Sequence, residues 1–299
     1  MTVRAAVLDV GSNSVRLLLL ERMTPQGAVG ERRATVTGLR KGAAADGTVA
    51  ADALDRLDAC LAGYAEAIAA AGHPPVVAVG TAAVREAANG DAIAAVVRRR
   101  LGVDPVVATG AEEATLAYRG ARMALGDAGG PCRMIDIGGA STEVVAGDES
   151  GPLHLVSLPL GVVRNAGDTV EGARAEAERL VRDATTAFPA AGPVIGLAGT
   201  VTQAAALCNG GYDPAEIHRQ HLSRAAIERV LAQAAALPLA ERRAMPGMHP
   251  DRADVIVNGM AILLGAMTAL GVDEVIVSER DLLDGIAGDP ALVPATVTE

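Results

Sequence analysis

The sequence predicts an α/β protein of two similar domains, and an internal duplication is the main reason. "LDVGSNSVRL" at residues 8–17 and "IDIGGASTEV" at residues 135–144 share one outline, in which a strand ending in Asp is followed by a glycine-containing turn and hydroxyl side chains. Asp9 and Asp136 are 127 positions apart (136 − 9), and the same offset aligns the glycine and the serine of each turn. The second observation is that strand-like and helix-like patterns alternate along both halves.

A second, less exact sequence repeat supports the duplication. "VAVGTAA" at residues 77–83 resembles "GLAGTVT" at residues 196–202, which places Thr81 against Thr200. Because two kinds of turn recur in the same order, we expect one domain over 1–120 and a second over 121–299. We expect the domains to face each other across a central cleft, with the last helix, 280–288, packing back on the first domain.

The elements of the first half follow from periodicity and turn signals. Buried apolar runs around "GSNS" predict a β-hairpin, and the stripe from Leu54 to Ile68 predicts an amphipathic helix. In order, we expect a hairpin over 3–22, helix 51–72, strand 76–81, one helix over 82–102, strand 104–110 and helix 111–126.

The second half repeats this order. A second hairpin follows from the duplicated turn, and the apolar surface of "RADVIVNGMAILLGAMTALG" predicts a buried helix. In order, we expect strands 132–138, 142–148 and 153–161, helix 171–187, strand 193–200, helix 252–271, strand 273–279 and the final helix.

Composition excludes several classes of protein. The net charge of −10 argues against a general polyanion or nucleic-acid binder, although a few positioned donors can still hold a small anion. No run of eighteen apolar residues and no signal-peptide pattern is present, so we expect no membrane association. Cys60, Cys132 and Cys208 lack metal-type or redox spacing, which favours a reducing cytoplasm.

The duplicated turns suit phosphate chemistry. A tight Gly/Ser turn after a strand presents backbone N–H groups in one direction, which is a nest for phosphate oxygens. An Asp at the end of each strand cannot itself favour phosphate, but it is suited to holding Mg²⁺ beside one. Capping of the turn is the alternative for a single Asp, and it explains two Asp residues at duplicated positions less well.

As an ordered set, the motifs resemble one known family. They are "VLDVGSNSVRLLLLE", "GTAAVREAAN", "TGAEEATLAYRGA", "MIDIGGASTEV", "SLPLGVVR", "GLAGTVTQAAAL", "HPDRADVIVNGMAIL" and "VSERDLLDGIA". Together they are similar to the exopolyphosphatase / guanosine pentaphosphate phosphohydrolase (Ppx/GppA) family over residues 3–288. That family belongs to the actin, sugar kinase and Hsp70 superfamily, so the resemblance implies two duplicated ribonuclease-H-like domains.

The resemblance also implies catalytic residues. The general base of the family lies in the motif matched by "GAEEA", which assigns Glu113. Without the resemblance, Glu113 would be read as a first-turn helix carboxylate that interacts with the helix dipole. Asp136 and Glu143 match the acidic residues around Mg²⁺ and the scissile phosphate, and Asp9 is a further candidate ligand. The implied cofactor is Mg²⁺, with Mn²⁺ as a substitute.

Other residues are implied to contact phosphate. Arg85 matches the arginine that holds the terminal phosphates, a task suited to a planar, permanently charged guanidinium. The remaining candidates are small or hydroxyl residues of the glycine-rich turns, namely Asn13, Ser14, Gly138, Gly139, Ala140, Ser141, Gly199 and Thr200. His218 and His221 have a ligand-like spacing but no third partner, so we do not assign them to a metal.

Three departures from the family pattern bear on function. The second turn has Ala140 where the family has a third glycine, and positive φ there would strain the loop. "LRKG" at 39–42 brings Arg40 and Lys41 to a loop expected at the cleft mouth. The sequence ends near the end of the second domain, without the helical extensions of longer members, so we expect a preference for short polyphosphate.

The leading hypothesis is an exopolyphosphatase that uses Mg²⁺ to release orthophosphate from polyphosphate. Guanosine pentaphosphate presents the same terminal phosphate and is the main alternative. A kinase or ATPase of the same superfamily is disfavoured by "GAEEA" and "SLPLG", and a non-catalytic sensor is disfavoured by Glu113, Asp136 and Glu143. As family members are often dimers, a homodimer is expected.

Overall fold

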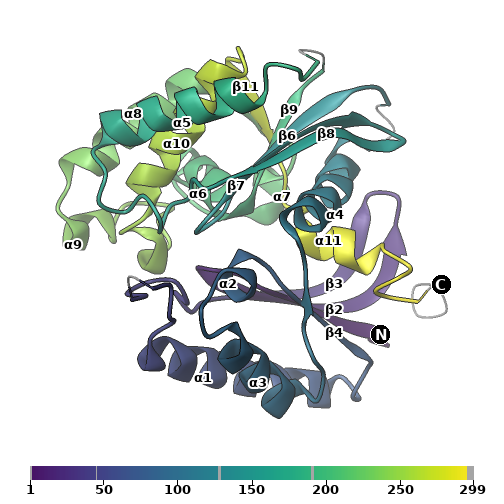
Figure 1. Cartoon of the computed structure of the whole chain (residues 1–299). Helices are drawn as coiled ribbons and strands as arrows, with labels where there is room; N and C mark the ends of the chain where they lie inside the picture. The colour runs from purple at the N-terminus through teal and green to yellow at the C-terminus, as the bar shows by residue number, and fades with distance from the viewer. Residues whose placement is uncertain (1, 45, 127–128, 190–191, 295–299) are drawn as a thin grey trace. The chain divides into compact units, whose positions relative to one another are not determined.

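The computed structural model divides the chain into two compact units (Figure 1). Residues 2–44, 46–126, 129–189 and 192–294 are described. The first unit is Met1–Met123 together with Leu282–Glu299, and the second is Ala124–Asp281. The last five residues of the range expected for the second domain, 295–299, lie outside the described residues.

The first unit is built on a five-stranded mixed sheet. Its spatial order is β3-β2-β1-β4-β5. Strands β1, β2 and β3 form an antiparallel meander, while β4 and β5 continue parallel to β1. The strands are β1 (Ala5–Val10), β2 (Ser14–Thr24), β3 (Gly27–Val36), β4 (Val76–Gly80) and β5 (Val106–Val107).

Helices cover both faces of this sheet (Figure 1). α1 (Ala51–Ala70) and α3 (Gly90–Leu101) lie on one face, where their apolar stripes pack against Ala6, Leu8 and Val10 of β1. α4 (Gly110–Arg122) and the late helix α11 (Leu282–Ala287) lie on the other face. The short α2 (Ala82–Arg85) follows β4. Because side chains alternate along a strand, Asp9 belongs to the face covered by α4.

The buried Asp284 ties α11 to the first unit. Its side chain accepts a hydrogen bond from the N–H of Ala28 at 2.9 Å and forms an ion pair with Arg32 at 2.7 Å. Gly285 lies so close to α4 that an added Cβ would be 1.9 Å from the carbonyl oxygen of Leu116.

The second unit has a six-stranded sheet in the order β10-β11-β9-β6-β7-β8. Helices α5, α6, α8 and α10 share one continuous core with Ile135 and Ile137 of β6. The strands are β6 (Cys132–Ile137), β7 (Thr142–Asp148), β8 (Gly151–Leu158), β9 (Val194–Leu197), β10 (His221–Ser223) and β11 (Glu274–Val277). The helices are α5 (Val170–Ala184), α6 (Ala198–Asn209), α7 (Pro214–Ile217), α8 (Arg224–Ala236), α9 (Leu239–Arg242) and α10 (Ile256–Ala269).

The two sheets have the same topology. In each, a three-stranded antiparallel meander is followed by two strands parallel to its first strand. β6, β7, β8, β9 and β11 therefore correspond to β1–β5, and β10 is an additional antiparallel edge strand. The duplication read from the turns extends to the whole sheet.

The structure corrects four expected elements. β3 was not predicted, because Glu31, Arg32 and Arg33 interrupt the alternation of this exposed edge strand. The single helix expected over 82–102 is divided into α2 and α3 by a turn at 86–89. The strand expected over 104–110 is reduced to the two residues of β5, and β10 was missed because it is only three residues long.

Hydropathy gives one further observation. Within the described ranges, none of the helices combines the length and apolar character needed to cross a membrane.

Candidate active site

The two duplicated turns have the same backbone geometry. The N–H of Gly11 donates to the carbonyl of Ser14 at 3.1 Å, and the N–H of Gly138 donates to the carbonyl of Ser141 at 2.9 Å. The preceding aspartates occupy the same register position, since Asp9 lies opposite a residue of β2 and Asp136 opposite a residue of β7 at the next-to-last pair of each hairpin. The sequence duplication is thus a duplication of structure.

In the first unit, the loop after β3 holds the carbonyls of the turn. The N–H groups of Thr37 and Gly38 donate to the carbonyl of Asn13 at 3.0 and 2.9 Å, and the N–H of Arg40 donates to that of Ser12 at 3.1 Å. In a planar trans peptide, the carbonyl and the following N–H point in opposite directions. The N–H groups of Asn13 and Ser14 therefore point away from this loop, in the orientation that an anion nest requires.

The loop after β8 holds the second turn in the same way. The N–H of Val162 donates to the carbonyl of Gly138 at 3.1 Å, and the N–H groups of Val163 and Arg164 donate to that of Gly139 at 2.8 and 3.1 Å. Arg164 also donates through Nε to the carbonyl of Ala140 at 2.7 Å. Gly161 permits this approach, because an added Cβ would be 2.5 Å from the carbonyl oxygen of Gly139.

This arrangement leaves consecutive backbone donors on the second turn. Because the carbonyls of 138–140 face the loop, the N–H groups of Gly139, Ala140 and Ser141 face away from it, and within the described residues they donate to no acceptor. Ala140 is not among the residues with positive φ. Its methyl group therefore imposes no backbone strain, and the turn retains its three donors.

The charges beside the two turns differ. In the first unit, Arg16 lies opposite Asp9 and donates to its Oδ2 through Nε at 2.9 Å and Nη2 at 2.7 Å. Asp9 is only 4% exposed, so this ion pair compensates a buried carboxylate. The carboxylate proposed from sequence as a metal ligand thus already has a cationic partner within its own unit.

In the second unit, the equivalent pair consists of two carboxylates. Glu143 lies opposite Asp136, is 2% exposed and accepts a hydrogen bond from the hydroxyl of Ser157 at 2.6 Å. Like charges directly opposite one another destabilise a sheet, so a cation between them would be stabilising. Among the described residues, no three His, Cys, Asp or Glu side chains gather as a metal site. Two carboxylates beside a phosphate nest nevertheless fit Mg²⁺, which takes few protein ligands and completes its shell with water and phosphate.

Glu113 lies in the first turn of α4, inside the first unit. A capping box between Thr109 and Glu112 fixes where this helix begins. The side chain of Glu113 is 13% exposed and accepts a hydrogen bond from Nη1 of Arg85 at 3.0 Å. Burial raises the pKa of Glu113 to about 7 despite this bond, and the charges of Asp9 and Glu86 raise it further. At neutral pH the carboxyl group is therefore poised to accept or release a proton.

The guanidinium of Arg85 has donors that make no hydrogen bond to the described residues. Its Nη1 donates to the carbonyl of Ala108 at 2.6 Å as well as to Glu113, whereas Nε and Nη2 donate no hydrogen bond to the described residues. A guanidinium has five N–H donors in a planar fork. Arg85 can thus hold Glu113 and still offer two nitrogen atoms to phosphate oxygens.

The strand–helix turns that carry Thr81 and Thr200 are similar but differ in length by one residue. Thr81 and Thr200 direct their hydroxyls to equivalent carbonyls, those of Val10 at 3.4 Å and Ile137 at 3.3 Å. The strand register, however, matches Val79 with Leu197, because these residues lie beside Asp9 and Asp136 respectively. The second unit therefore has one extra residue before its threonine, and the expected match of the two loops residue for residue is corrected.

The extra residue has a structural consequence. Ala198 adopts a left-handed conformation, with φ of 62°, where β9 turns into α6. Beside it, Gly199 lies against Arg252, since an added Cβ would be 1.3 Å from Nη1 of that arginine. Gly199 and Thr200 lie in the first turn of α6, where helical N–H groups lack partners within the helix.

Sequence reasoning assigned no role to four of these residues. Arg16, Glu86, Arg164 and Arg252 all lie within the quoted motifs, and each follows a predicted turn or strand end. Their position close to a predicted turn or strand end is the sequence signal that could have identified them. The two histidines contact protein groups instead: His218 accepts from the N–H of Glu279 at 3.2 Å, and His221 contacts Glu274 at 2.8 Å.

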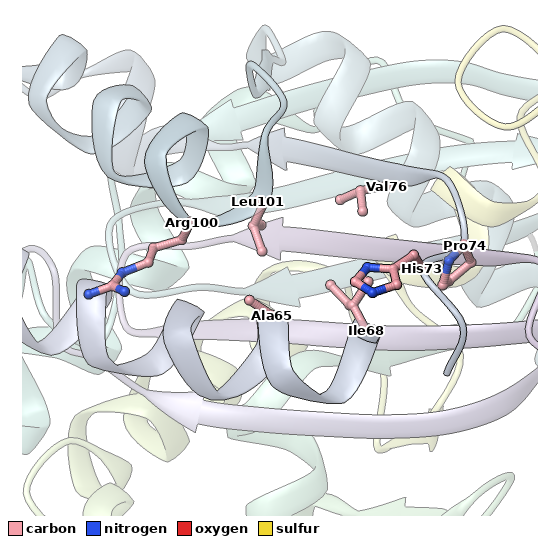
Figure 2. A pocket seen from close by; sticks show the side chains of 7 residues that line it. All are labelled: Ala65, Ile68, His73, Pro74, Val76, Arg100 and Leu101. Atoms are coloured by element: carbon pink, nitrogen blue, oxygen red, sulfur yellow. The ribbon is translucent and has the colours of Figure 1, made fainter. Parts of the chain in front are cut away.

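A separate hollow of about 320 Å³ lies in the first unit (Figure 2). Figure 2 shows His73 and Arg100 among mostly apolar neighbours, including Ile68 and Leu101. The guanidinium of Arg100 is paired with Asp58, and none of the residues assigned to phosphate or metal lines this hollow. The candidate active-site residues are those of the turns and of α4.

Known proteins with similar sequences include exopolyphosphatases. Exopolyphosphatase 2 of Mycobacterium tuberculosis is 34% identical over 312 residues, which cover 95% of this chain and 97% of that protein. Exopolyphosphatase 1 of Mycobacterium leprae is 29% identical over 95% of this chain and 88% of that protein.

Solved structures agree in fold. An exopolyphosphatase-like protein superposes with a TM-score of 0.83 at 29% identity, covering 95% of this chain and 98% of that one. The Aquifex aeolicus member of the Ppx/GppA family gives a TM-score of 0.76 at 27% identity, covering 94% and 95%. An exopolyphosphatase from Cytophaga hutchinsonii, 23% identical, shares the fold with a TM-score of 0.85 over 99% of each chain.

The two mixed sheets and these likenesses show the duplicated ribonuclease-H-like fold of the actin, sugar kinase and Hsp70 superfamily. The Ppx/GppA phosphatase family model matches residues 22–291, which include β7, β8, α4 and every motif after the first turn. The chain therefore belongs to the Ppx/GppA phosphatase family.

Proposed function

We propose that the protein is an exopolyphosphatase that hydrolyses the terminal phosphoanhydride of inorganic polyphosphate and releases orthophosphate. The observation that carries this proposal is Glu113, a buried carboxyl group with a pKa near 7 held 3.0 Å from Arg85. Exopolyphosphatase relatives at up to 34% identity support polyphosphate as the substrate class.

In this reaction, water attacks the terminal phosphorus and the bond to the bridging oxygen breaks. Glu113 accepts a proton from the attacking water, and Arg85 binds oxygens of the terminal phosphate through its remaining donors. Phosphoryl transfer requires mainly positioning and charge neutralisation.

Mg²⁺ is the proposed cofactor, with Mn²⁺ as a substitute. Asp136 and Glu143 are its proposed ligands, because they form a like-charged pair beside the second turn. When bound, the ion would neutralise phosphate charge during the reaction. Asp9 is the weaker candidate, since Arg16 already neutralises it.

Short chains are the preferred substrates in this proposal. The net charge of −10 opposes the approach of a long polyanion, whereas a short one meets mainly the local donors of the turns. Guanosine pentaphosphate ends in the same phosphoanhydride, so it is the competing substrate in the test.

The test is orthophosphate release from tripolyphosphate, long polyphosphate, guanosine pentaphosphate and ATP in parallel, with and without Mg²⁺. We expect release from tripolyphosphate that requires the metal and falls by about 10² or more in Glu113→Gln. Release from the guanosine nucleotide alone would assign the alternative substrate. No release from any compound would reject the enzyme, and full activity of Glu113→Gln would reject only the base.

A further inference from the structure

A row of three polar side chains crosses the sheet of the second unit. Asp136 of β6 lies opposite Glu143 of β7, and Glu143 lies opposite Ser157 of β8. Residues directly opposite one another in a sheet present their side chains on the same face. The hydroxyl of Ser157 donates to Oε1 of Glu143 at 2.6 Å. The row therefore ends in a hydrogen bond to one of the two carboxylates proposed as metal ligands.

The equivalent row of the first unit has neither the second carboxylate nor the hydroxyl. There, Asp9 lies opposite Arg16, and Arg16 lies opposite Ala34 of β3. A guanidinium thus takes the place of the second carboxylate, and a methyl group takes the place of the hydroxyl. Because the antiparallel pairing is the same in both units, the sheet itself does not require a serine at this position. The serine accompanies the acidic pair.

The hydrogen bond from Ser157 has the geometry of a strong one. A hydroxyl that donates to an ionised carboxylate typically lies about 2.5–2.7 Å from it, closer than in a bond between neutral groups. Glu143 is only 2% exposed, so little water competes for its oxygen atoms. The last torsion of a glutamate side chain is broad and has weak preferences of its own. A short hydrogen bond to one oxygen therefore restricts how the carboxylate of Glu143 is turned.

The position of Ser157 is itself fixed by the end of β8. The next residue, Leu158, is buried and lies opposite Thr142 of β7. The hydroxyl of Thr142 donates to the carbonyl of Leu160 at 2.7 Å, which holds the chain after β8 against β7. The first unit has Val15 at the position of Thr142, and valine cannot make this hydrogen bond. The second unit therefore holds its serine donor in place with a contact that the first unit lacks.

We propose that Ser157 is a positioning residue for metal binding. Its hydroxyl holds Oε1 of Glu143 and so fixes the orientation in which this carboxylate binds a divalent cation together with Asp136. Carboxylates that ligate metals are commonly held by such hydrogen bonds, and the loss of one weakens metal binding by about 10- to 100-fold. This role rests on the proposed function, in which Asp136 and Glu143 are the metal ligands.

Two substitutions at this position separate the hydroxyl from the space that it occupies. Ser157→Ala introduces the residue found at the equivalent position of the first unit, and the Kd for Mn²⁺ should rise by about tenfold or more. Ser157→Thr keeps a hydroxyl and suits a β-strand, so its Kd should stay within about twofold of the wild-type value. Calorimetric titration of the full chain with Mn²⁺ alone measures each Kd.

Ser223→Ala is the matched control in the same unit. Ser223 is the N-cap of α8, and its side chain accepts a hydrogen bond from the N–H of Ala226 at 3.3 Å. Loss of this cap should lower the urea concentration at the midpoint of unfolding without changing the Kd for Mn²⁺. Glu143→Gln identifies the site, because the binding event that this variant weakens is the one that Ser157 must affect.

The titrations contain no substrate, so they are separate from the test of phosphate release. Weaker Mn²⁺ binding by Ser157→Ala, with affinity near that of the wild type in Ser157→Thr and Ser223→Ala, would support the positioning role. Wild-type affinity in Ser157→Ala, or equal weakening in all three serine variants, would overturn it. If the wild-type protein has no Mn²⁺ site that Glu143→Gln weakens, the metal ligands and the role of Ser157 are both rejected, whatever the phosphate assay shows.

Discussion

The two duplicated turns of this protein have the same backbone hydrogen bonds but different charged residues beside them. Both are closed by the same hydrogen bond, and both have their carbonyls held by the loop after the third strand of the sheet. In the first unit, the cross-strand pair is Asp9 with Arg16, whereas in the second it is Asp136 with Glu143. The first turn thus has a basic residue opposite its aspartate, and the second has an acidic one.

This difference shows how a duplicated fold can acquire an asymmetric site. The backbone of each turn is fixed mainly by backbone hydrogen bonds, none of which involves the side chain opposite the aspartate. The residue opposite the aspartate can therefore change sign without loss of the turn. Two acidic residues lie opposite each other at this position only in the second hairpin, which is why the metal is proposed to bind mainly there.

The largest expected effect is on the acidic pair. Glu143→Gln keeps the acceptor for Ser157 but removes one charge, and we expect orthophosphate release to fall by about 10²–10⁴. The concentration of Mg²⁺ needed for half-maximal activity should also rise. Steady-state kinetics over a range of Mg²⁺ concentrations measures both.

Asp9→Asn is the matched control in the first unit. It also converts an acidic side chain to an amide, at the same register position as Asp136. If the acidic pair of the second unit binds the metal, Asp9→Asn changes activity without changing the concentration of Mg²⁺ needed for half-maximal activity. An equal shift of Mg²⁺ dependence in both variants would place metal binding in both units and remove the distinction.

The second expected effect concerns the stability of the first unit. Arg16→Glu converts its pair into that of the second unit and leaves the buried Asp9 beside a second carboxylate. We expect destabilisation by about 3–5 kcal/mol, the size found when a buried ion pair loses one partner. Urea unfolding in the presence of a chelator measures this change.

Addition of Mg²⁺ distinguishes charge from packing in that variant. If the acidic pair can bind the ion, millimolar Mg²⁺ should restore part of the lost stability through binding to the native state. Arg16→Met, which has no second carboxylate, should show a smaller recovery. Equal behaviour of the two variants would argue that Arg16 acts through packing alone.

The third expected effect separates Glu113 from the acidic pair of the second unit. A base with a pKa of about 7 must be ionised to act, so kcat/KM should fall about tenfold per pH unit below pH 7. The same shift affects folding with a defined sign. Because the folded pKa is raised from its ordinary 4.5, the native state loses about 3 kcal/mol as pH rises from about 4.5 through 7.

Glu113→Gln tests both consequences. The glutamine side chain of this variant cannot ionise. Residue 113 should therefore no longer lower the stability of the native state as pH rises across that interval. Thermal unfolding of both proteins between pH 4 and pH 8 gives the comparison. A wild-type stability curve that rises through this interval, relative to the variant, would contradict the raised pKa.

Much of this arrangement was predictable from the sequence. The duplicated turns were visible because glycine, serine and aspartate recur at a fixed offset, and most strands because aliphatic runs alternate with turn residues. β3 was not predictable from alternation, since this edge strand carries charged residues. The break between α2 and α3 was missed because alanine-rich segments on both sides favour a helix.

The arrangement of the candidate site was harder to predict from the sequence, for a physical reason. The motifs contain Glu113 and Arg85, but the pairing of these residues depends on where α2 ends and where α4 begins in space. Apart from the side chain of Arg164, the loops that hold the turns make their hydrogen bonds to them through backbone N–H groups, so most of their residue identities carry little signal. Arg40 and Glu86 come from two separate segments of the chain, and only the folded chain brings their side chains within 4.0 Å of each other.

The smallest expected effect tests the one-residue difference between the strand–helix turns that carry Thr81 and Thr200. Ala198 has φ of 62°, whereas the equivalent position in the first unit, Gly80, is not left-handed. Left-handed backbone costs a residue with a Cβ about 1–2 kcal/mol, and glycine avoids that cost. Ala198→Gly should therefore stabilise the protein by about 1 kcal/mol, measured by urea unfolding.

Ala205→Gly is the internal control, because Ala205 lies within the same helix, α6, without positive φ. That substitution should destabilise the protein by about 1 kcal/mol or more, because the unfolded chain gains freedom and a buried methyl group is lost. Opposite signs for one chemical change within one helix would show that the extra residue is accommodated by backbone strain at Ala198. If Ala198→Gly destabilises as Ala205→Gly does, the strain is absent, and Gly199 with its arginine neighbour must accommodate the extra residue.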